Sequence, residues 1–94
     1  MTYLYLIGRM YGDCKSMSPP IKIGVSNNPW TRLATIQTSC PFNLYIYHYF
    51  RFNSRIEAFE VESELHSQYE EKRLCGEWFN VDPEIIFDQL GGLG

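Results

Sequence analysis

The chain has 94 residues and a mass of 11.0 kDa, which suffices for one hydrophobic core and leaves no room for a second. Its 45% hydrophobic and 20% charged residues exclude an intrinsically disordered chain. The longest uninterrupted apolar stretch, residues 3–7, is far shorter than the roughly 20 residues of a membrane span, and no basic segment precedes it as in a signal peptide. The 3 cysteines form no C-x-x-C pair, so they indicate neither a disulfide framework nor a zinc ribbon. We therefore expect residues 1–94 to form one domain that acts in the cytoplasm, away from membranes.

The charges divide unevenly along the chain. The net charge of −3 and the pI near 5.2 would on average disfavour binding to a phosphate backbone. Residues 1–56, however, carry 6 Lys and Arg against 1 Asp, a net charge of +5, whereas residues 57–94 carry 2 Lys and Arg against 10 acids, a net charge of −8. Such a division can place a basic face beside an acidic one, which suits a protein that holds a polyanion on one side and a divalent metal on the other. Two ordinary solvated surfaces are the alternative.

The first part of the chain indicates a β-hairpin. Residues 2–9 are dense in aromatic and large apolar side chains and predict a strand that is buried on at least one face. Residues 10–20 have the Gly, Asp, Ser and Pro content of a loop, and residues 21–25 read as a second, shorter strand. Two strands joined in this way pair most simply as an antiparallel hairpin with a long, mobile tip.

A helix and a third strand are expected next. Asn28 can cap a helix and Pro29 suits its first position, so residues 29–38 are expected to be helical. Residues 43–52 alternate two sets of side chains with the period of two that is typical of a strand, which we expect to be central in the sheet.

The remaining elements complete a mixed fold. Ser54 and Glu57 form a capping box, which predicts a helix from there to about residue 69. Residues 77–81 predict a short closing strand, and residues 82–83 begin a last helix that two glycines end at residues 91–92. The order of elements predicts an α+β fold, in which a small, mostly antiparallel sheet carries helices on its face. We expect Trp78 and Phe79 to be structural, with at least one side chain turned inward.

Glu62 is the most informative single residue. At about 100° per residue it lies only about 40° from Ala58, inside the apolar stripe of its helix. A carboxylate aimed at a packed face needs a cation, hydrogen bonds or a metal ion, because an unpaired buried charge is costly. Arg32, at the edge of the apolar stripe of its own helix, can grip a phosphate through two parallel donors. A structural ion pair between Arg32 and Glu62 is the alternative for both residues.

Taken together in chain order, these residues and their neighbours resemble the GIY-YIG nuclease superfamily. Within it, the chain is most similar to the small phage and prophage DNA-binding-domain branch, over residues 3–79. The motifs that carry the resemblance are Tyr3-Leu4-Tyr5, then Lys22-Ile23-Gly24 continuing to Pro29, then Arg32-Leu33 with residues 36–38, then Glu62 with Leu65-His66, and the Gly-Glu-Trp-Phe block of residues 76–79.

The resemblance implies a central antiparallel sheet of about three strands flanked by helices, and in active members a one-metal cleavage of a DNA phosphodiester. Glu62 would then hold Mg²⁺ or Mn²⁺, Arg32 would neutralise charge on the phosphorane, and Tyr5 or a nearby water path would deliver the nucleophile. A single carboxylate suits Mg²⁺, which keeps most of its waters. The expected contacts to DNA are Lys22, Arg32, Arg51 and Arg55, and we expect Tyr5, Lys22, Arg32 and Glu62 to converge on one concave face of the sheet.

The departures from the family pattern keep other functions open. Tyr3 stands where the first motif has Gly, and Lys22 stands where the second has Tyr. The leading hypothesis is a metal-dependent DNA endonuclease, and the alternatives are a catalytically silent DNA-binding module of the same fold and a phage-encoded protein that binds a host protein. We expect no attached recognition domain, and a homodimer would compensate for its absence, since two linked weak contacts gain affinity by effective concentration.

Overall fold

The computed structural model describes residues 2–9 and 19–91. The expected mobile tip of the first hairpin falls almost entirely on residues 10–18, outside the described residues. Within them, no helix is both long enough and apolar enough to cross a membrane.

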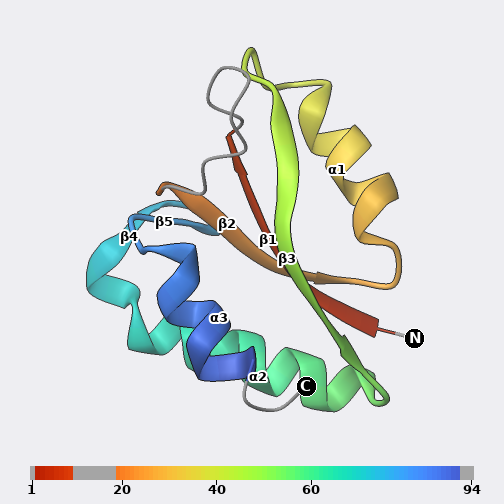
Figure 1. Ribbon diagram of the computed structural model, residues 1–94, viewed down its shortest axis with the longest axis vertical. Helices are drawn as coiled ribbons and strands as arrows, with labels where there is room; N and C mark the ends of the chain where they lie inside the picture. The colour runs from red at the N-terminus through yellow and green to blue at the C-terminus, as the bar shows by residue number, and fades with distance from the viewer. Residues whose placement is uncertain (1, 10–18, 92–94) are drawn as a thin grey trace.

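The fold is α+β, as the order of predicted elements indicates, but its sheet has five strands rather than about three (Figure 1). Capping by Asn28 and Ser54 starts the first two helices where the sequence predicts, through hydrogen bonds accepted from Thr31 N and Glu57 N. The elements in chain order are β1 (Thr2–Arg9), β2 (Ile21–Ser26), α1 (Pro29–Gln37), β3 (Leu44–Phe52), α2 (Arg55–Gln68), the 3-10 turn η1 (Glu70–Lys72), β4 (Arg73–Cys75), β5 (Trp78–Phe79) and α3 (Pro83–Gly91).

The strand order is β3-β1-β2-β5-β4, with antiparallel pairing of neighbours. The expected hairpin of β1 and β2 is confirmed. The prediction that β3 is central was wrong, because β3 is an edge strand whose alternating side chains are partly exposed, whereas β1 is buried almost throughout. The short β4 was not predicted: its three residues are all exposed, and a turn at Gly76, with a φ of 56°, joins it to β5.

Helix α1 lies on one side of the sheet and α2 and α3 lie on the other (Figure 1), and each side holds a hydrophobic cluster. On one face, Leu4 and Leu6 of β1 pack with side chains of α2 and α3, including Ala58 and Leu65. On the other face, Tyr5 and Ile7 pack with side chains of α1 and with Trp78. The fold is therefore three layers deep, and β1 contributes alternate residues to both cores.

Phe79 has the inward orientation expected of one member of the Trp-Phe pair. Its side chain is completely buried, and its ring centroid lies 5.0 Å from that of His66 on α2. Trp78, the neighbouring residue on β5, is half-buried in the cluster on the opposite face. The pair thus joins β5 to both cores.

Candidate functional site

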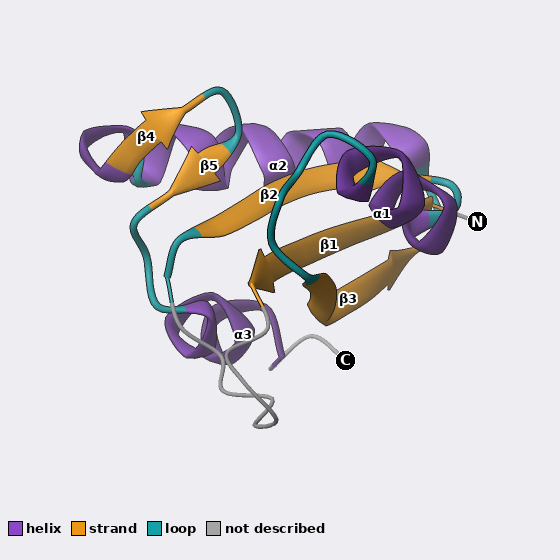
Figure 2. Cartoon of the chain, turned by 90° about the horizontal axis from the view of Figure 1, so that it is seen from above, coloured by secondary structure: helices purple, strands orange, loops and turns teal. Residues whose placement is uncertain are grey.

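The outer edge of β2 is where the predicted site residues meet. In register, β5 pairs with β2 only at Ile21 and Lys22, and the backbone N–H of Ile23 donates to the carbonyl of Glu77 at 3.1 Å. Beyond that point α2, not another strand, runs along the side of β2 that faces away from β1 (Figure 2).

Two side chains of α2 meet the backbone groups that this edge leaves without a strand partner. The Glu62 carboxylate accepts a hydrogen bond from the backbone N–H of Val25. One turn further along α2, His66 Nε2 lies 3.1 Å from the carbonyl oxygen of Ile23. Glu62 is therefore half-buried at the edge of the sheet, held by backbone contact as well as by its place in the helix.

Tyr5 reaches the same place from the sheet. It stands opposite Gly24 in the β1–β2 register, and its side chain is 1% exposed. A Cβ added at Gly24 would lie 2.5 Å from Tyr5 Cζ, so the absence of a side chain at Gly24 makes room for the phenol. The Arg32 guanidinium, on α1, donates a hydrogen bond to the Tyr5 hydroxyl oxygen. Tyr5 of the first quoted motif thus lies on Gly24 of the second.

Lys22 lies on the same face of the sheet as Tyr5, because it pairs with Ile7. Its Nζ lies 3.2 Å from Glu77 Oε2 and 5.8 Å from the centroid of the Trp78 ring. The ammonium is therefore held between a carboxylate and an aromatic face at the start of the open edge.

The electrostatics of Glu62 follow from this crowding. Burial raises the pKa of Glu62 above its ordinary value, and the negative charge of Glu77 adds to the increase. Smaller effects in the opposite direction come from His66, Lys22 and the Val25 N–H. A bound cation would relieve the same unfavourable charge that burial and Glu77 create.

The pKa of Tyr5 is also raised. Burial is the main cause, and the hydrogen bond from Arg32 opposes it. The charges of Glu77 and Glu62 act on Tyr5 as well, in the direction that favours the neutral phenol. The structure therefore brings Tyr5, Lys22, Arg32 and Glu62 together around the edge of β2. That they line one concave face of the sheet stays a prediction.

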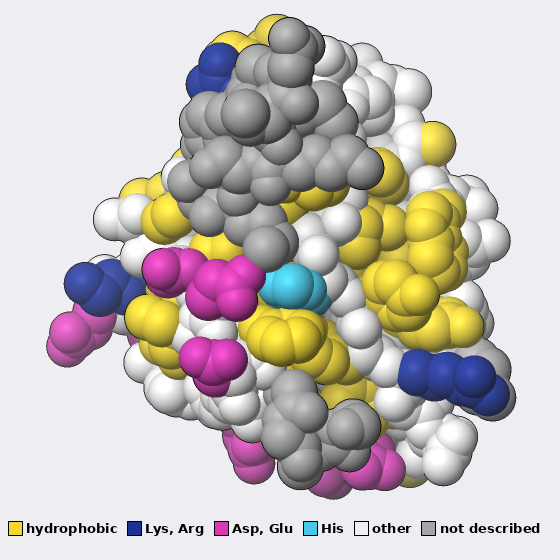
Figure 3. Space-filling model, viewed as in Figure 1, with side chains coloured by type: hydrophobic (Ala, Val, Ile, Leu, Met, Phe, Trp, Pro, Cys, Tyr) yellow, Lys and Arg dark blue, Asp and Glu magenta, His cyan; other side chains and the backbone are white. Residues whose placement is uncertain are grey.

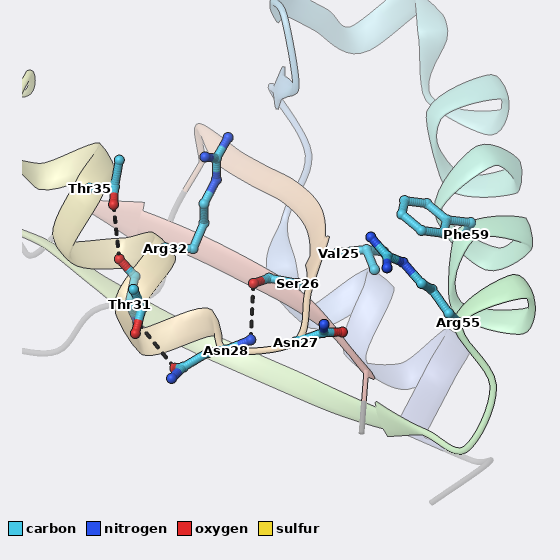
Figure 4. A pocket seen from close by; sticks show the side chains of 9 residues that line it. All are labelled: Val25, Ser26, Asn27, Asn28, Thr31, Arg32, Thr35, Arg55 and Phe59. Atoms are coloured by element: carbon cyan, nitrogen blue, oxygen red, sulfur yellow. Dashed lines mark hydrogen bonds between the residues drawn. The ribbon is translucent and has the colours of Figure 1, made fainter.

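An open cleft of about 660 Å³ lies beside this cluster, and we call it the α1–α2 cleft (Figure 4). Arg32 enters it from α1, while Arg55 and Phe59 form the opposite wall on α2. The Arg55 guanidinium carbon lies 5.5 Å from the centroid of the Phe59 ring. The full lining is Val25, Ser26, Asn27, Asn28, Thr31, Arg32, Thr35, Arg55 and Phe59.

Arg51, the remaining predicted DNA contact, is not brought to this cleft. It lies on β3, opposite Tyr3, at the other edge of the three long strands. Its side chain is exposed. Of the four predicted basic contacts, Arg32 and Arg55 therefore line the cleft, Lys22 lies at the start of the open edge of β2, and Arg51 is on a separate surface.

Glu77 and His66 belong to the cluster but were not among the predicted site residues. Both lie inside the quoted motifs, so the pattern marked their positions without indicating a role. Their contacts depend on the pairing of β5 with β2 and on the packing of α2 against β2, which link residues far apart in sequence. No local pattern reports such pairings.

The side chains at this edge offer a carboxylate, Glu62, to a divalent metal. Among residues 2–9 and 19–91, no group of three or more His, Cys, Asp and Glu side chains could hold a metal ion. Mg²⁺ does not require such a group, because it is commonly bound through one or two carboxylates and keeps several waters. Glu62, half-buried and in contact with Val25, which lines the α1–α2 cleft, meets that lower requirement.

Comparison with known proteins identifies the family. One curated relative, named "Putative endonuclease" from Escherichia phage T5, is 33% identical over 88 residues, which cover 84% of this chain and 31% of the relative. The chain thus spans about a third of the length of that protein. No solved structure matches the chain. The family model of the T5orf172 domain matches residues 2–91, nearly the whole sequence, and the chain therefore belongs to the T5orf172 domain family.

Proposed function

We propose that this domain is a metal-dependent endonuclease of the GIY-YIG type, which hydrolyses phosphodiester bonds of DNA at the α1–α2 cleft. The observation that carries the proposal is the meeting of Tyr5, Arg32 and Glu62 at the open edge of β2, next to a cleft with arginines on both walls. The name of the relative from phage T5 supports the same class of activity.

Phosphate binding falls to the basic side chains. Arg32 and Arg55 line opposite walls of the cleft, so a phosphate between them would face a guanidinium on each side. Lys22 would also bind phosphate if its ammonium left the Glu77 carboxylate and contacted a phosphate oxygen instead. Arg32 is placed to neutralise the charge that builds on the phosphorus centre during cleavage.

Glu62 would hold the metal, Mg²⁺ or Mn²⁺. When bound, such an ion polarises a phosphoryl oxygen and stabilises the leaving oxygen. The raised pKa of Glu62 and its single backbone hydrogen-bond donor suit a carboxylate that gains from a nearby cation. The His66 imidazole, one turn along α2, would keep the carboxylate oriented through its own contact with the edge of β2.

Tyr5 would position the reacting oxygen. Because its pKa is raised, the phenol stays neutral near neutral pH and keeps a proton to donate. Its oxygen already accepts from Arg32, so the O–H would be directed to the attacking water or to the phosphate. The phenol and the guanidinium would thereby act as one unit.

A catalytically silent DNA-binding module is the second candidate, and a specific contact favours it. The family Tyr is replaced by Lys22, whose ammonium is engaged by Glu77 at 3.2 Å rather than free for proton chemistry. Such a module would use the same cleft and the same cations, but it would release DNA uncut.

Incubation of the purified domain with supercoiled plasmid in Mg²⁺ or Mn²⁺ tests the proposal. We expect nicked and linear products from the parent protein and none from Glu62→Gln, because the ion loses its protein ligand. Glu60→Gln is the matched control, since Glu60 lies on the same helix with an exposed side chain and should leave cleavage unchanged.

The control outcomes separate the candidates. Salt-dependent binding of DNA without any cleavage by the parent protein would favour the silent module. Absence of both cleavage and DNA binding at low salt would refute the proposal and favour a protein partner.

A further inference from the structure

Three aromatic rings form an exposed cluster on the sheet face that carries α1, and we call it the aromatic platform. It consists of Tyr3 of β1, Trp30 of α1 and Tyr49 of β3. Trp30 is 52% exposed and Tyr49 is 53% exposed, so about half of each large ring system meets solvent. Hydrophobic side chains gather on this flank of the molecule, where Figure 1 places α1 and β3 (Figure 3).

The rings hold one another in edge-to-face packing. Their centroids lie 5.9 Å apart for Tyr3 and Trp30, 5.9 Å for Tyr3 and Tyr49, and 5.2 Å for Trp30 and Tyr49. The interplanar angles of 67° to 78° mean that no ring stacks flat on another. Because Trp30 and Tyr49 are each about half exposed, ring surface remains available for a flat ligand, and the mutual packing limits the entropy that binding would cost.

Arg51 places a positive charge beside the platform. Arg51 pairs with Tyr3 in register and is two residues from Tyr49 on β3, so its exposed side chain lies on the same face of the sheet. Within residues 1–56 the sequence contains only one acid, Asp13. Exposed Trp and Tyr beside a cation are what a nucleic-acid base and its phosphate require, whereas an apolar protein partner would not need the cation.

The platform and the α1–α2 cleft both include residues at the start of α1. Trp30 lies in the first turn of α1, between Asn28 and Thr31, both of which line the cleft. The cleft and the platform therefore lie on two flanks of the same helical turn, with Arg32 on one side and Trp30 on the other. A strand that leaves the cleft around the N-terminal end of α1 would reach the platform directly.

We propose that the aromatic platform stacks an unpaired base of the DNA strand whose phosphate is held in the α1–α2 cleft. This inference rests on the proposed function and names its substrate class, DNA with unpaired nucleotides next to the site of cleavage. Arg51 would bind the phosphate of the stacked nucleotide, which gives a role to the one predicted basic contact that lies away from the cleft.

Fluorescence anisotropy with a labelled oligo(dT) strand and with a blunt duplex tests the proposal. Trp30→Ala and Tyr49→Ala are each expected to raise the Kd for oligo(dT) by about 5- to 150-fold, the usual effect of losing one stacked base. The salt dependence of binding should not change, because no charge is removed. Tyr49→Phe should bind like the parent, since it keeps the ring.

Phe42→Ala is the matched control for these variants. Phe42 is 47% exposed and has the Arg9 guanidinium carbon 4.0 Å from its ring centroid, so it reproduces an exposed ring beside a cation. It precedes β3, whereas the platform lies near the end of that strand. Its substitution is expected to leave the affinity for oligo(dT) unchanged.

A second measurement needs no change in the platform. The chain has 2 tryptophans, so Trp78→Phe leaves Trp30 as the only one. Saturating oligo(dT) should then quench the tryptophan emission strongly, and the blunt duplex should quench it far less, because only an unpaired base can stack on the ring.

The results distinguish this proposal from the function on which it rests. If the parent protein binds duplex DNA and neither oligo(dT) affinity nor Trp30 emission responds as stated, the platform proposal is wrong while the cleft assignment stands. If the parent binds no DNA, both fail. A Trp30→Ala variant that turns a dimer into a monomer in sedimentation, with unchanged DNA affinity, would reassign the platform to contact between copies of this chain.

Discussion

Gly24→Ala should damage the candidate site through a single methyl group. An ideal Cβ at this position would lie 2.5 Å from Cζ and 3.0 Å from Cε1 of Tyr5, distances too short for carbon atoms. The ring cannot give way easily, because Tyr5 is 1% exposed and packs in the cluster under α1. The phenol must therefore tilt, and its hydroxyl must move away from Arg32.

The magnitude follows from the cost of overpacking. An extra methyl group that displaces a packed ring costs about 1–3 kcal/mol, which is a minor part of the roughly 5–15 kcal/mol of a typical domain. The variant should therefore remain folded, with a lowered urea midpoint, and its activity can be measured per folded molecule. We expect plasmid cleavage to fall to the level of Tyr5→Phe, which removes the same hydroxyl without the clash.

Gly8→Ala is the matched control for this experiment. A Cβ at Gly8 would meet the ring of Tyr47, so the variant suffers a similar clash away from the cleft. It should lose comparable stability and keep its activity. Wild-type stability and cleavage in Gly24→Ala would refute the reasoning, because the Tyr5 hydroxyl would then be either undisturbed or unnecessary.

Three further variants test other parts of the structure. Arg32→Ala should reduce the slope of log Kd against log salt by about 0.9 for duplex DNA, measured by anisotropy, because one phosphate contact is lost. Glu62→Gln should raise the urea midpoint at neutral pH. Because the pKa of Glu62 is raised in the folded state, the parent protein loses stability as the pH rises through that pKa, and the neutral Gln avoids this loss. The difference between the two proteins should vanish below the usual pKa of glutamate, where Glu62 is protonated in both the folded and the unfolded state. Phe79→Ala should lower the free energy of unfolding by about 3–5 kcal/mol in urea titrations, since the ring is completely buried; a parent-like midpoint would mean that Phe79 is not part of the core.

The elements that local chemistry determines were predictable from the sequence. The caps at Asn28 and Ser54 and the period of each helix place α1 and α2 to within a residue or two. The position of β3 was not predictable in the same way, since an alternating pattern describes a strand exposed on one face and does not say how many neighbours pair with it. The three residues of β4 are all exposed, and so short a strand shows no alternation of buried and exposed side chains.

In the candidate site, too, the local sequence predicted the orientation of a side chain but not its tertiary contacts. The inward orientation of Glu62 follows from its angle on α2, and the structure places it half-buried. The contacts of Glu77 with Lys22 and of His66 with Ile23 depend on which strand edge lies beside which helix. Arg51 looked equivalent to Arg55 as a cation in sequence, yet the register puts it opposite Tyr3, on another surface.

The acidic second half of the chain does not oppose DNA binding, because α2 sorts its charges by angle. At about 100° per residue, Arg55, Phe59 and His66 all lie within about 60° of Glu62, on the side that meets β2 and the cleft. The exposed Glu57, Glu60 and Glu64 lie about 140–160° away, on the opposite side of the helix. A polyanion would thus be repelled from the outer surface of α2 and attracted to the cleft, so under the proposed function these acids would direct DNA toward a site that a net charge of −3 would seem to exclude.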